Sequence, residues 1–233
     1  MGRLLRTWNL FHGNAVPPQR RAFLDEMVRL VTADGPDVVL LQEVPVWALR
    51  RLERWSRMHA FPAVARRPRV GSAELGRLIT DLNHGLFRSA VSGQANAVLA
   101  RHGEGRGVLE LTRTPERRVA QAVQLTGGPL VVNLHASQDG RAADEETLKA
   151  AAWAESLTDG PIVLAGDFNL RLATARSFPQ LAERGFRHVG GSVVDHVLVR
   201  GVVVGPVERW PDARRTLDGR LLSDHARLEV TIE

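Results

Sequence analysis

The chain has 233 residues, of which 44% are hydrophobic, and its formal charge of +5 comes from 31 basic and 26 acidic residues. This composition excludes a disordered chain and predicts one compact domain over residues 1–233. The absence of cysteine excludes disulfides and thiolate metal sites, so any metal must have oxygen or imidazole ligands. This ligand set points to a hard cation such as Mg²⁺ or Mn²⁺. The mild positive charge permits a polyanionic substrate but does not require one.

The chain shows no pattern typical of membrane insertion or export. Its first residues, MGRLLRTWNLFHGN, lack the apolar core of a signal peptide. No stretch of about 18 apolar residues follows. We therefore expect a cytoplasmic protein that does not enter a membrane.

Strands and helices interleave in the first part of the chain. Apolar residues at helical spacing on one face predict a helix over residues 17–33, and a continuous apolar run over 37–42 predicts a strand covered on both faces. The other predicted elements are a strand over 3–9, a helix over 46–57, and a surface excursion over 66–84 with a short helix over 72–82.

Short strands with turn signals between them dominate the remainder. The predicted strands cover residues 95–100, 107–111, 119–125, 129–134, 161–165, 192–199, 202–207 and 226–232, and a helix is predicted over 141–157. This mixture favours an α/β layered domain, in which helices cover the faces of sheets.

Polar side chains follow several of these apolar runs directly. The strings are TWN (Asn9), VVLLQE (Glu43), VVNLH (His135), IVLAGDFN (Asp167, Asn169), VVDHVLV (Asp195, His196) and LLSDH (Asp224, His225). A single carboxylate at a strand end commonly marks only the point where the strand reaches solvent. The repetition suggests that these strand ends converge on one acidic, histidine-bearing pocket.

Each string also has a purely structural interpretation. Asp167 and Asn169 flank Phe168, so in an extended segment both face the same way, although an Asx turn would use the same residues. Asp195 interrupts an apolar run, and a buried carboxylate requires a partner, for which a histidine is suited. His135 alone would fit a satisfied histidine at a sheet edge.

The combination of LQE, GDFN and a C-terminal SDH resembles the endonuclease/exonuclease/phosphatase superfamily, in the family's order from Asn9 to His225. The resemblance implies a four-layered α/β sandwich of two mixed β-sheets, face to face and flanked by helices. A single cleft would lie at one edge of the sheets. It also implies a divalent-metal-dependent phosphoesterase that uses Mg²⁺ or Mn²⁺.

The resemblance further implies a role for each residue at a strand end. Metal binding would fall to Asn9, Glu43 and Asp224. Asp167 would orient or deprotonate the attacking water, and His135 would contact the phosphate or help to protonate the leaving oxygen. His225, oriented by Asp195, would stabilise the transition state. The residues expected to contact phosphate or substrate are Asn169, Asn96 and Arg118.

The substrate is less well defined by the sequence. Nucleic acid is favoured by arginines that could surround the cleft, namely Arg66, Arg67, Arg69, Arg113, Arg117, Arg118 and the 209–215 loop with Trp210. Ser192 stands where abasic-site enzymes tend to carry an aromatic residue. The alternatives are a phosphatase or phosphodiesterase acting on a small phosphorylated metabolite or lipid headgroup, and a non-catalytic binding protein that retains the fold. The oligomeric state stays open.

Overall fold

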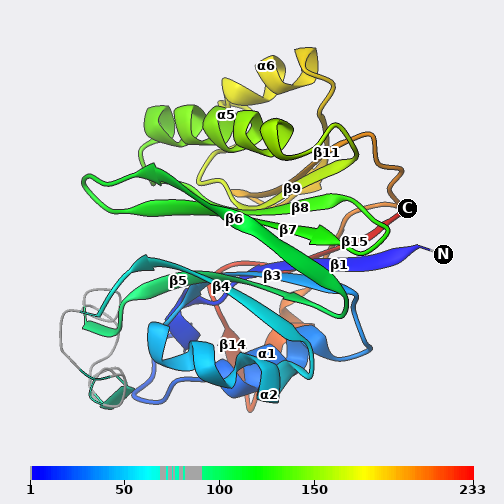
Figure 1. The fold of residues 1–233 in the computed structure, drawn as a ribbon. Coiled ribbons are helices and arrows are strands. Elements are labelled where there is room, and N and C mark those ends of the chain that lie inside the picture. Colours follow the sequence, from blue (N-terminus) through cyan, green and yellow to red (C-terminus); the bar gives the residue numbers. More distant parts are fainter. Residues whose placement is uncertain (1, 69–71, 73–74, 76, 79–80, 82–90) are drawn as a thin grey trace.

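The computed structural model describes residues 2–68, 72, 75, 77, 78, 81 and 91–233. Two six-stranded sheets pack face to face, and helices cover both outer faces (Figure 1). The sheet orders are β12-β15-β1-β3-β5-β4 and β10-β11-β9-β8-β7-β6. The predicted four-layered α/β sandwich is therefore confirmed.

The first sheet and its covering elements come mostly from the N-terminal half. Its strands are β1 (Arg3–Asn9), β3 (Val38–Val44), β4 (His59–Arg66), β5 (Gln94–Ala100), β12 (Glu208–Arg209) and β15 (Leu228–Ile232). Its outer face carries α1 (Leu24–Thr32), the 3-10 helix η2 (Val46–Arg51) and α2 (Leu52–Ser56). The smaller elements nearby are η1 (Phe11–Gly13), η3 (Asp212–Arg215), β2 (Ala15–Val16), β13 (Thr216–Leu217) and β14 (Arg220–Leu222).

The second sheet is built from the middle of the chain. Its strands are β6 (Gly103–Thr112), β7 (Arg118–Leu125), β8 (Leu130–His135), β9 (Ile162–Asp167), β10 (Arg187–Gly191) and β11 (Asp195–Arg200). Its outer face carries α5 (Gly140–Leu157) and α6 (Ser177–Glu183). No helix among the described residues is long and apolar enough to cross a membrane.

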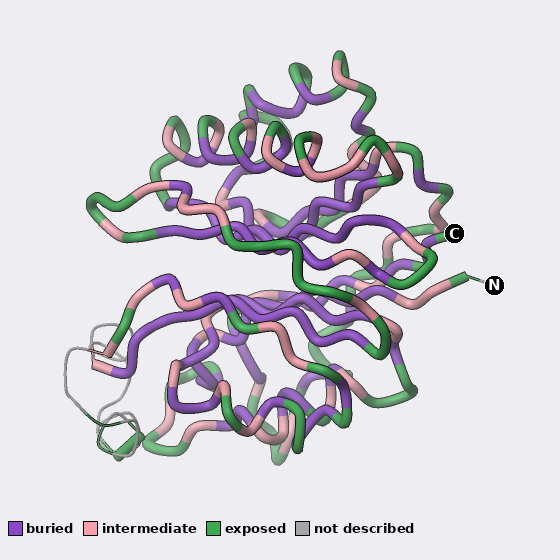
Figure 2. Tube along the Cα trace, in the orientation of Figure 1, coloured by how far each residue is buried: buried purple, intermediate pink, exposed green. Residues whose placement is uncertain are grey.

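The core lies in three apolar layers. Between the sheets, Leu40 and Val98 of the first sheet belong to the same buried cluster as Val131 and Val163 of the second. Two further clusters lie under the helices on either side. Figure 2 shows the same division, with buried strands in the middle and exposed residues on the outer faces of the helices. Strands covered on both faces explain the continuous apolar runs in the sequence.

The sheet topology gathers many strand ends at one edge. β1 and β3 are parallel, as are β8 and β9, so their carboxyl ends share an edge within each sheet. The antiparallel strands β5, β7 and β11 begin at these same edges. A hydrogen bond of 2.9 Å from Asn9 Nδ2 to Asp167 Oδ2 joins the two edges. Residues far apart in the sequence are thereby brought to one place.

Two sequence predictions about regular structure were wrong. The helix predicted over residues 17–33 begins only at Leu24, because a residue before proline, such as Pro17, is disfavoured in helical conformation. The strand predicted over 202–207 forms only an isolated bridge between Val204 and Ile232, and Pro206 has no N–H for a ladder. The excursion predicted over 66–84, with its short helix, lies largely outside the described residues.

Several elements were not predicted. β4 contains Pro62, which argues against a central strand, but β4 is an edge strand and tolerates it. α6 is a helix of only seven residues, and β10 contains two glycines. Short or glycine-rich segments give weak periodicity, so tertiary packing decides their structure.

Candidate active site

Glu43 occupies a β-bulge near the end of β3. The register with β5 shifts between Leu41 and Val44, and Glu43 has a positive φ of 53°. A bulge redirects a side chain at a sheet edge. The Glu43 carboxylate is 18% exposed, with Oε2 3.1 Å from Nε2 of His12 and Oε1 3.8 Å from Nε2 of His135. The carboxylate therefore lies beside two histidines and remains partly accessible.

Asp167, at the end of β9, lies at the centre of the cluster. Its Oδ2 accepts from Asn9 at 2.9 Å, and its Oδ1 accepts from the Asn169 N–H at 3.0 Å. Oδ2 is also 3.6 Å from Nε2 of His135 and 3.8 Å from Nε2 of His225. Burial, reinforced by the charge of Asp195, raises the pKa of Asp167 to about 7, against the opposing influence of His225 and the two hydrogen bonds. A carboxylate in this range is suited to accepting a proton from water.

His225 and Asp195 form a hydrogen-bonded pair. Nδ1 of His225 lies 3.0 Å from Oδ1 of Asp195, and Ser192 Oγ donates to the other oxygen at 2.8 Å. Burial alone would lower the pKa of His225, but the hydrogen bond to Asp195 and the charges of Asp195, Asp167 and Asp224 raise it to about 10. The imidazole is thus held as a cation, and its Nε2 lies 3.8 Å from Oδ2 of Asp167.

His135 has a different electrostatic state. Nη1 of Arg118 lies 2.8 Å from Nε2 of His135, and Gln94 Nε2 lies 3.2 Å from Nδ1. Burial first, and then the positive charge of Arg118, lower the pKa of His135 well below its usual value. His135 is therefore neutral at neutral pH, which suits a hydrogen-bonding role better than a cationic one.

The two asparagines expected to contact substrate are placed differently. Asn169 has a positive φ of 51°, and its Nδ2 donates to Ala136 O at 2.9 Å, which leaves one amide N–H for a phosphate oxygen. Asn96 is buried, and its Nδ2 donates to the backbone oxygen of Val119 at 3.0 Å. Asn96 therefore supports β7, and the expected substrate contact finds no support in this arrangement.

The carboxylates of Glu43 and Asp224 lie close enough to influence each other, and Asn9 reaches the same site through its hydrogen bond to Asp167. Partial burial raises the pKa of Asp224, with His225 opposing and the carboxylates of Glu43 and Asp195 adding to the rise. Asn9 Oδ1 accepts from the Phe11 N–H at 2.9 Å and keeps a second lone pair. This crowding of negative charge among hard oxygen donors fits Mg²⁺ or Mn²⁺.

A second group of possible ligands consists of Asp167, Asp195 and His225, whose ligand atoms lie within 4.8 Å of one another. These atoms already have partners within the protein. Asp195 is bonded to His225 and Ser192, and Asp167 to two donors. The oxygens of Glu43 and Asp224 have fewer hydrogen-bond partners among the described residues than those of Asp167 and Asp195, and are therefore the better candidates for metal ligands.

A buried polar network lies one position before Glu43 on β3 and two before His135 on β8. Gln42 Nε2 donates to Asn133 Oδ1 at 2.7 Å, and Asn133 Nδ2 donates to the backbone oxygens of Leu41 at 3.0 Å and Ala97 at 3.2 Å. Gln42 and Asn133 have no solvent exposure. The network links the two sheets directly behind the strand ends that carry Glu43 and His135.

Most arginines proposed to surround the cleft have partners within the protein. Arg113 and Arg117 both pair with Glu110, and Arg66 lies 4.0 Å from Glu116. Arg69 lies outside the described residues. The expectation for these arginines as a nucleic-acid surface is therefore weakened.

The 209–215 loop was also expected to contact substrate. Trp210 is only 3% exposed, and the guanidinium groups of Arg6, Arg214 and Arg227 lie over its ring. Arg215 is buried and donates to His225 O at 2.8 Å. This loop therefore shapes the segment that carries His225 and does not offer an aromatic surface to bases.

Sequence reasoning missed several residues of the site. His12 lies three residues after Asn9 in TWNLFHGN, in a left-handed conformation with φ 53°, and contacts Glu43. Gln94 precedes Asn96 by two positions and reaches His135. Ser192, considered only as a missing aromatic, donates to Asp195. The signals in the sequence were their positions close to Asn9, Asn96 and Asp195.

These features define the molecule as an α/β sandwich with a cluster of carboxylates and histidines at one edge of its sheets. The family model described as the Endonuclease/Exonuclease/phosphatase family matches residues 7–225. The chain therefore belongs to the endonuclease/exonuclease/phosphatase family. Members of this family are phosphoric ester hydrolases that generally depend on a divalent metal, and the chain is an enzyme of this class.

Solved structures share the fold at low sequence identity. An endonuclease/exonuclease/phosphatase from Beutenbergia cavernae has a TM-score of 0.74 and 18% identity, covering 100% of this chain and 71% of that one. A mannosyl-6-phosphatase from Bacteroides thetaiotaomicron has a TM-score of 0.70, 15% identity and 99% coverage of both chains. Truncated TDP2 from Caenorhabditis elegans has a TM-score of 0.66 and 15% identity, covering 100% of this chain and 97% of that one. No curated protein sequence matches the chain.

Proposed function

We propose that the chain is a divalent-metal-dependent phosphodiesterase that acts on nucleic acid. The observation that carries the proposal is the convergence of Glu43, Asp167 and His225, from three distant segments, in one cluster with His135. Phosphoester hydrolysis needs a group that activates water, a metal ligand and a donor that stabilises the phosphoryl oxygens. Asp167, Glu43 and His225 would fill these three roles.

Glu43, Asp224 and Asn9 are the residues proposed to hold the metal, with Mg²⁺ or Mn²⁺ as the ion. Their oxygen donors suit a hard cation, and the chain has no cysteine. When bound, the ion would offset the negative charge that develops on the phosphoryl oxygens. The chain's own residues would carry out the proton transfer and the positioning of substrate.

Asp167 is proposed to orient the attacking water and to accept its proton, because its carboxylate is fixed by Asn9 and the Asn169 N–H. The water oxygen forms the new bond to phosphorus as the bond to the leaving oxygen breaks. His225, fixed by Asp195, would stabilise the phosphoryl oxygens, and the second amide N–H of Asn169 would bind one of them. His135, whose Nε2 accepts from Arg118, would contact the phosphate or the leaving oxygen.

The experiment that tests this proposal measures hydrolysis by the purified protein with Mg²⁺ and with Mn²⁺. The substrates are single- and double-stranded DNA, RNA, an abasic duplex, bis(p-nitrophenyl) phosphate and a panel of phosphomonoesters. We expect metal-dependent cleavage of nucleic acid that EDTA abolishes. Hydrolysis restricted to phosphomonoesters would contradict the proposal.

A phosphatase acting on a small phosphorylated molecule is the second candidate. The observation that favours it is the burial of Trp210, which removes an aromatic surface on which bases could stack. The mannosyl-6-phosphatase that shares the fold makes a sugar phosphate a useful probe. Rapid release of inorganic phosphate from mannose 6-phosphate, without cleavage of oligonucleotides, would select this candidate.

A further inference from the structure

A cavity of about 720 Å³ opens beside Asn169, between the start of α5 and the loop that joins β9 to α6. Leu148, which is half-buried, contributes apolar surface, and Arg171 and Arg176 contribute guanidinium groups. This volume lies within the range typical of ligand pockets, roughly 300–1,000 Å³, and exceeds what one phosphate group needs. The cavity shares Asn169 with the candidate active site, so a ligand could extend from one into the other.

The other charged residues around the cavity have partners within the protein. Arg141 Nε pairs with Glu145 at 3.1 Å, within one turn of α5. Asp144 Oδ1 accepts from the Ser177 N–H at 2.8 Å, at the start of α6.

Arg171 and Arg176 differ from these residues. Both are exposed, and neither guanidinium forms an ion pair with any residue in the described part of the chain. Two uncompensated positive charges next to a proposed phosphate ligand favour a second anionic group on the substrate. Arg171 follows Asn169 by two positions, so their Cα atoms are at most about 7 Å apart.

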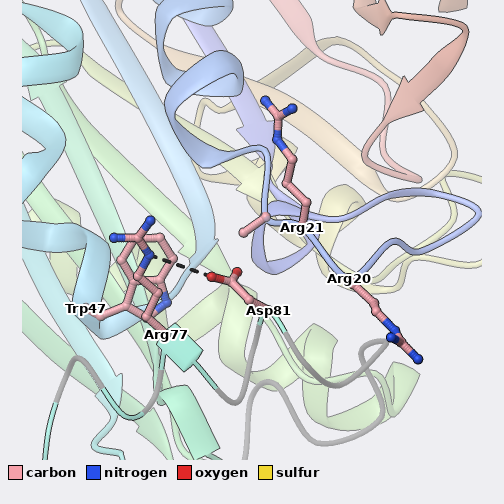
Figure 3. A pocket seen from close by; sticks show the side chains of 6 residues that line it. Arg20, Arg21, Trp47, Arg77 and Asp81 are labelled. Carbon is pink, nitrogen blue, oxygen red and sulfur yellow. Dashed lines mark ion pairs between the residues drawn. The ribbon is translucent and has the colours of Figure 1, made fainter.

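A second basic cavity, of about 460 Å³, lies near Trp47 (Figure 3). Its charges are largely compensated: Arg21 pairs with Glu26, and Arg77 lies 3.7 Å from Asp81 and over the Trp47 ring. Figure 3 shows Arg77 stacked on Trp47 and directed toward Asp81. The cavity beside Asn169 is therefore the better anion site.

We infer that the cavity beside Asn169 binds the nucleotide next to the scissile phosphate of a nucleic-acid strand. This inference rests on the proposed function and adds the residues that recognise the substrate. Arg171 and Arg176 contact the neighbouring phosphate, and the leucine surface accommodates the attached sugar or base. The arginines offer bidentate, charge-assisted hydrogen bonds that suit a phosphate.

The test compares the wild type with the double variant Arg171→Gln/Arg176→Gln on two substrates. A single-stranded DNA oligonucleotide carries the neighbouring phosphate, and bis(p-nitrophenyl) phosphate lacks it. We expect the ratio of kcat/KM for the oligonucleotide to kcat/KM for the small diester to fall about tenfold, mainly through the oligonucleotide KM. In metal-free buffer, the salt dependence of oligonucleotide binding should become shallower by about 0.7, the slope for one phosphate of a single strand.

Arg106→Gln is the control for the loss of a surface charge, because Arg106 is exposed on β6 and is not among the residues that line the cavity. An unchanged ratio and slope in the double variant, with cleavage of the oligonucleotide by the wild type, would overturn the inference and leave the proposed function intact. An equal change in Arg106→Gln would overturn it as well. Failure of the wild type to cleave or bind any oligonucleotide would overturn the proposed function and this inference together.

Discussion

Glu43 combines a left-handed backbone within a strand with a carboxylate that stays partly accessible among histidines. Such strain at a strand end is typical of functional sites. If Glu43 holds the metal, Glu43→Gln should lower the rate about 10²–10³-fold, because an electrostatic stabiliser of the transition state is lost. The checks are kcat with Mg²⁺ or Mn²⁺ and metal affinity by calorimetry.

Glu183→Gln provides the control for this substitution, since Glu183 is an exposed glutamate on α6. Glu183→Gln should have the same rate and the same metal affinity as the wild type. Full activity of Glu43→Gln at limiting Mg²⁺ would remove Glu43 from the metal site.

The His225 and Asp195 pair makes a second prediction at the scale of residues. His225→Ala should lower the rate about 10²–10⁴-fold, and Asp195→Asn should lower it less, because Asp195 acts by orienting and charging the ring. The double variant should lose little beyond His225→Ala. Additive losses in a double-mutant cycle of kcat/KM would show that the two residues act independently.

At the scale of elements, Asn133 connects β8 to β3 and β5 across the interface between the sheets. Asn133→Ala should lower the free energy of unfolding by about 1–3 kcal/mol, because Gln42 and two backbone oxygens lose buried partners. Urea denaturation followed by circular dichroism measures this change. Gln138→Ala, at an exposed position between β8 and α5, should shift the midpoint very little, and an equal shift in both variants would contradict the role of the network.

The elements also show which parts of the fold could be predicted from sequence patterns and which could not. Long amphipathic or continuous apolar runs predicted β1, β3, β7, β8 and α5 close to their observed limits. β4 was missed because Pro62 argues against a strand unless the strand lies at an edge, and edge position depends on tertiary structure. The bulge at Glu43 was likewise invisible, since it depends on the register with β5.

At the scale of the whole molecule, the two sheets share one apolar layer. We therefore propose that residues 1–233 form a single domain, which should unfold in one cooperative transition. Far-ultraviolet circular dichroism and tryptophan fluorescence should report the same midpoint in urea. Two separated transitions would show that the sheets belong to independent folding units.

The sequence by itself determined the fold class and named most residues of the candidate site. It could do so because the ends of parallel strands share an edge, and the apolar runs before Glu43, His135 and Asp167 identify those ends. The tertiary structure alone decided the charge state of each group. His135 and His225 are both histidines at strand or turn ends, yet burial and then Arg118 lower the pKa of His135, while Asp195 raises the pKa of His225 to about 10 against the effect of burial. Tertiary structure also decided which arginines are free to bind substrate, because this depends on which acidic groups the fold places beside each arginine.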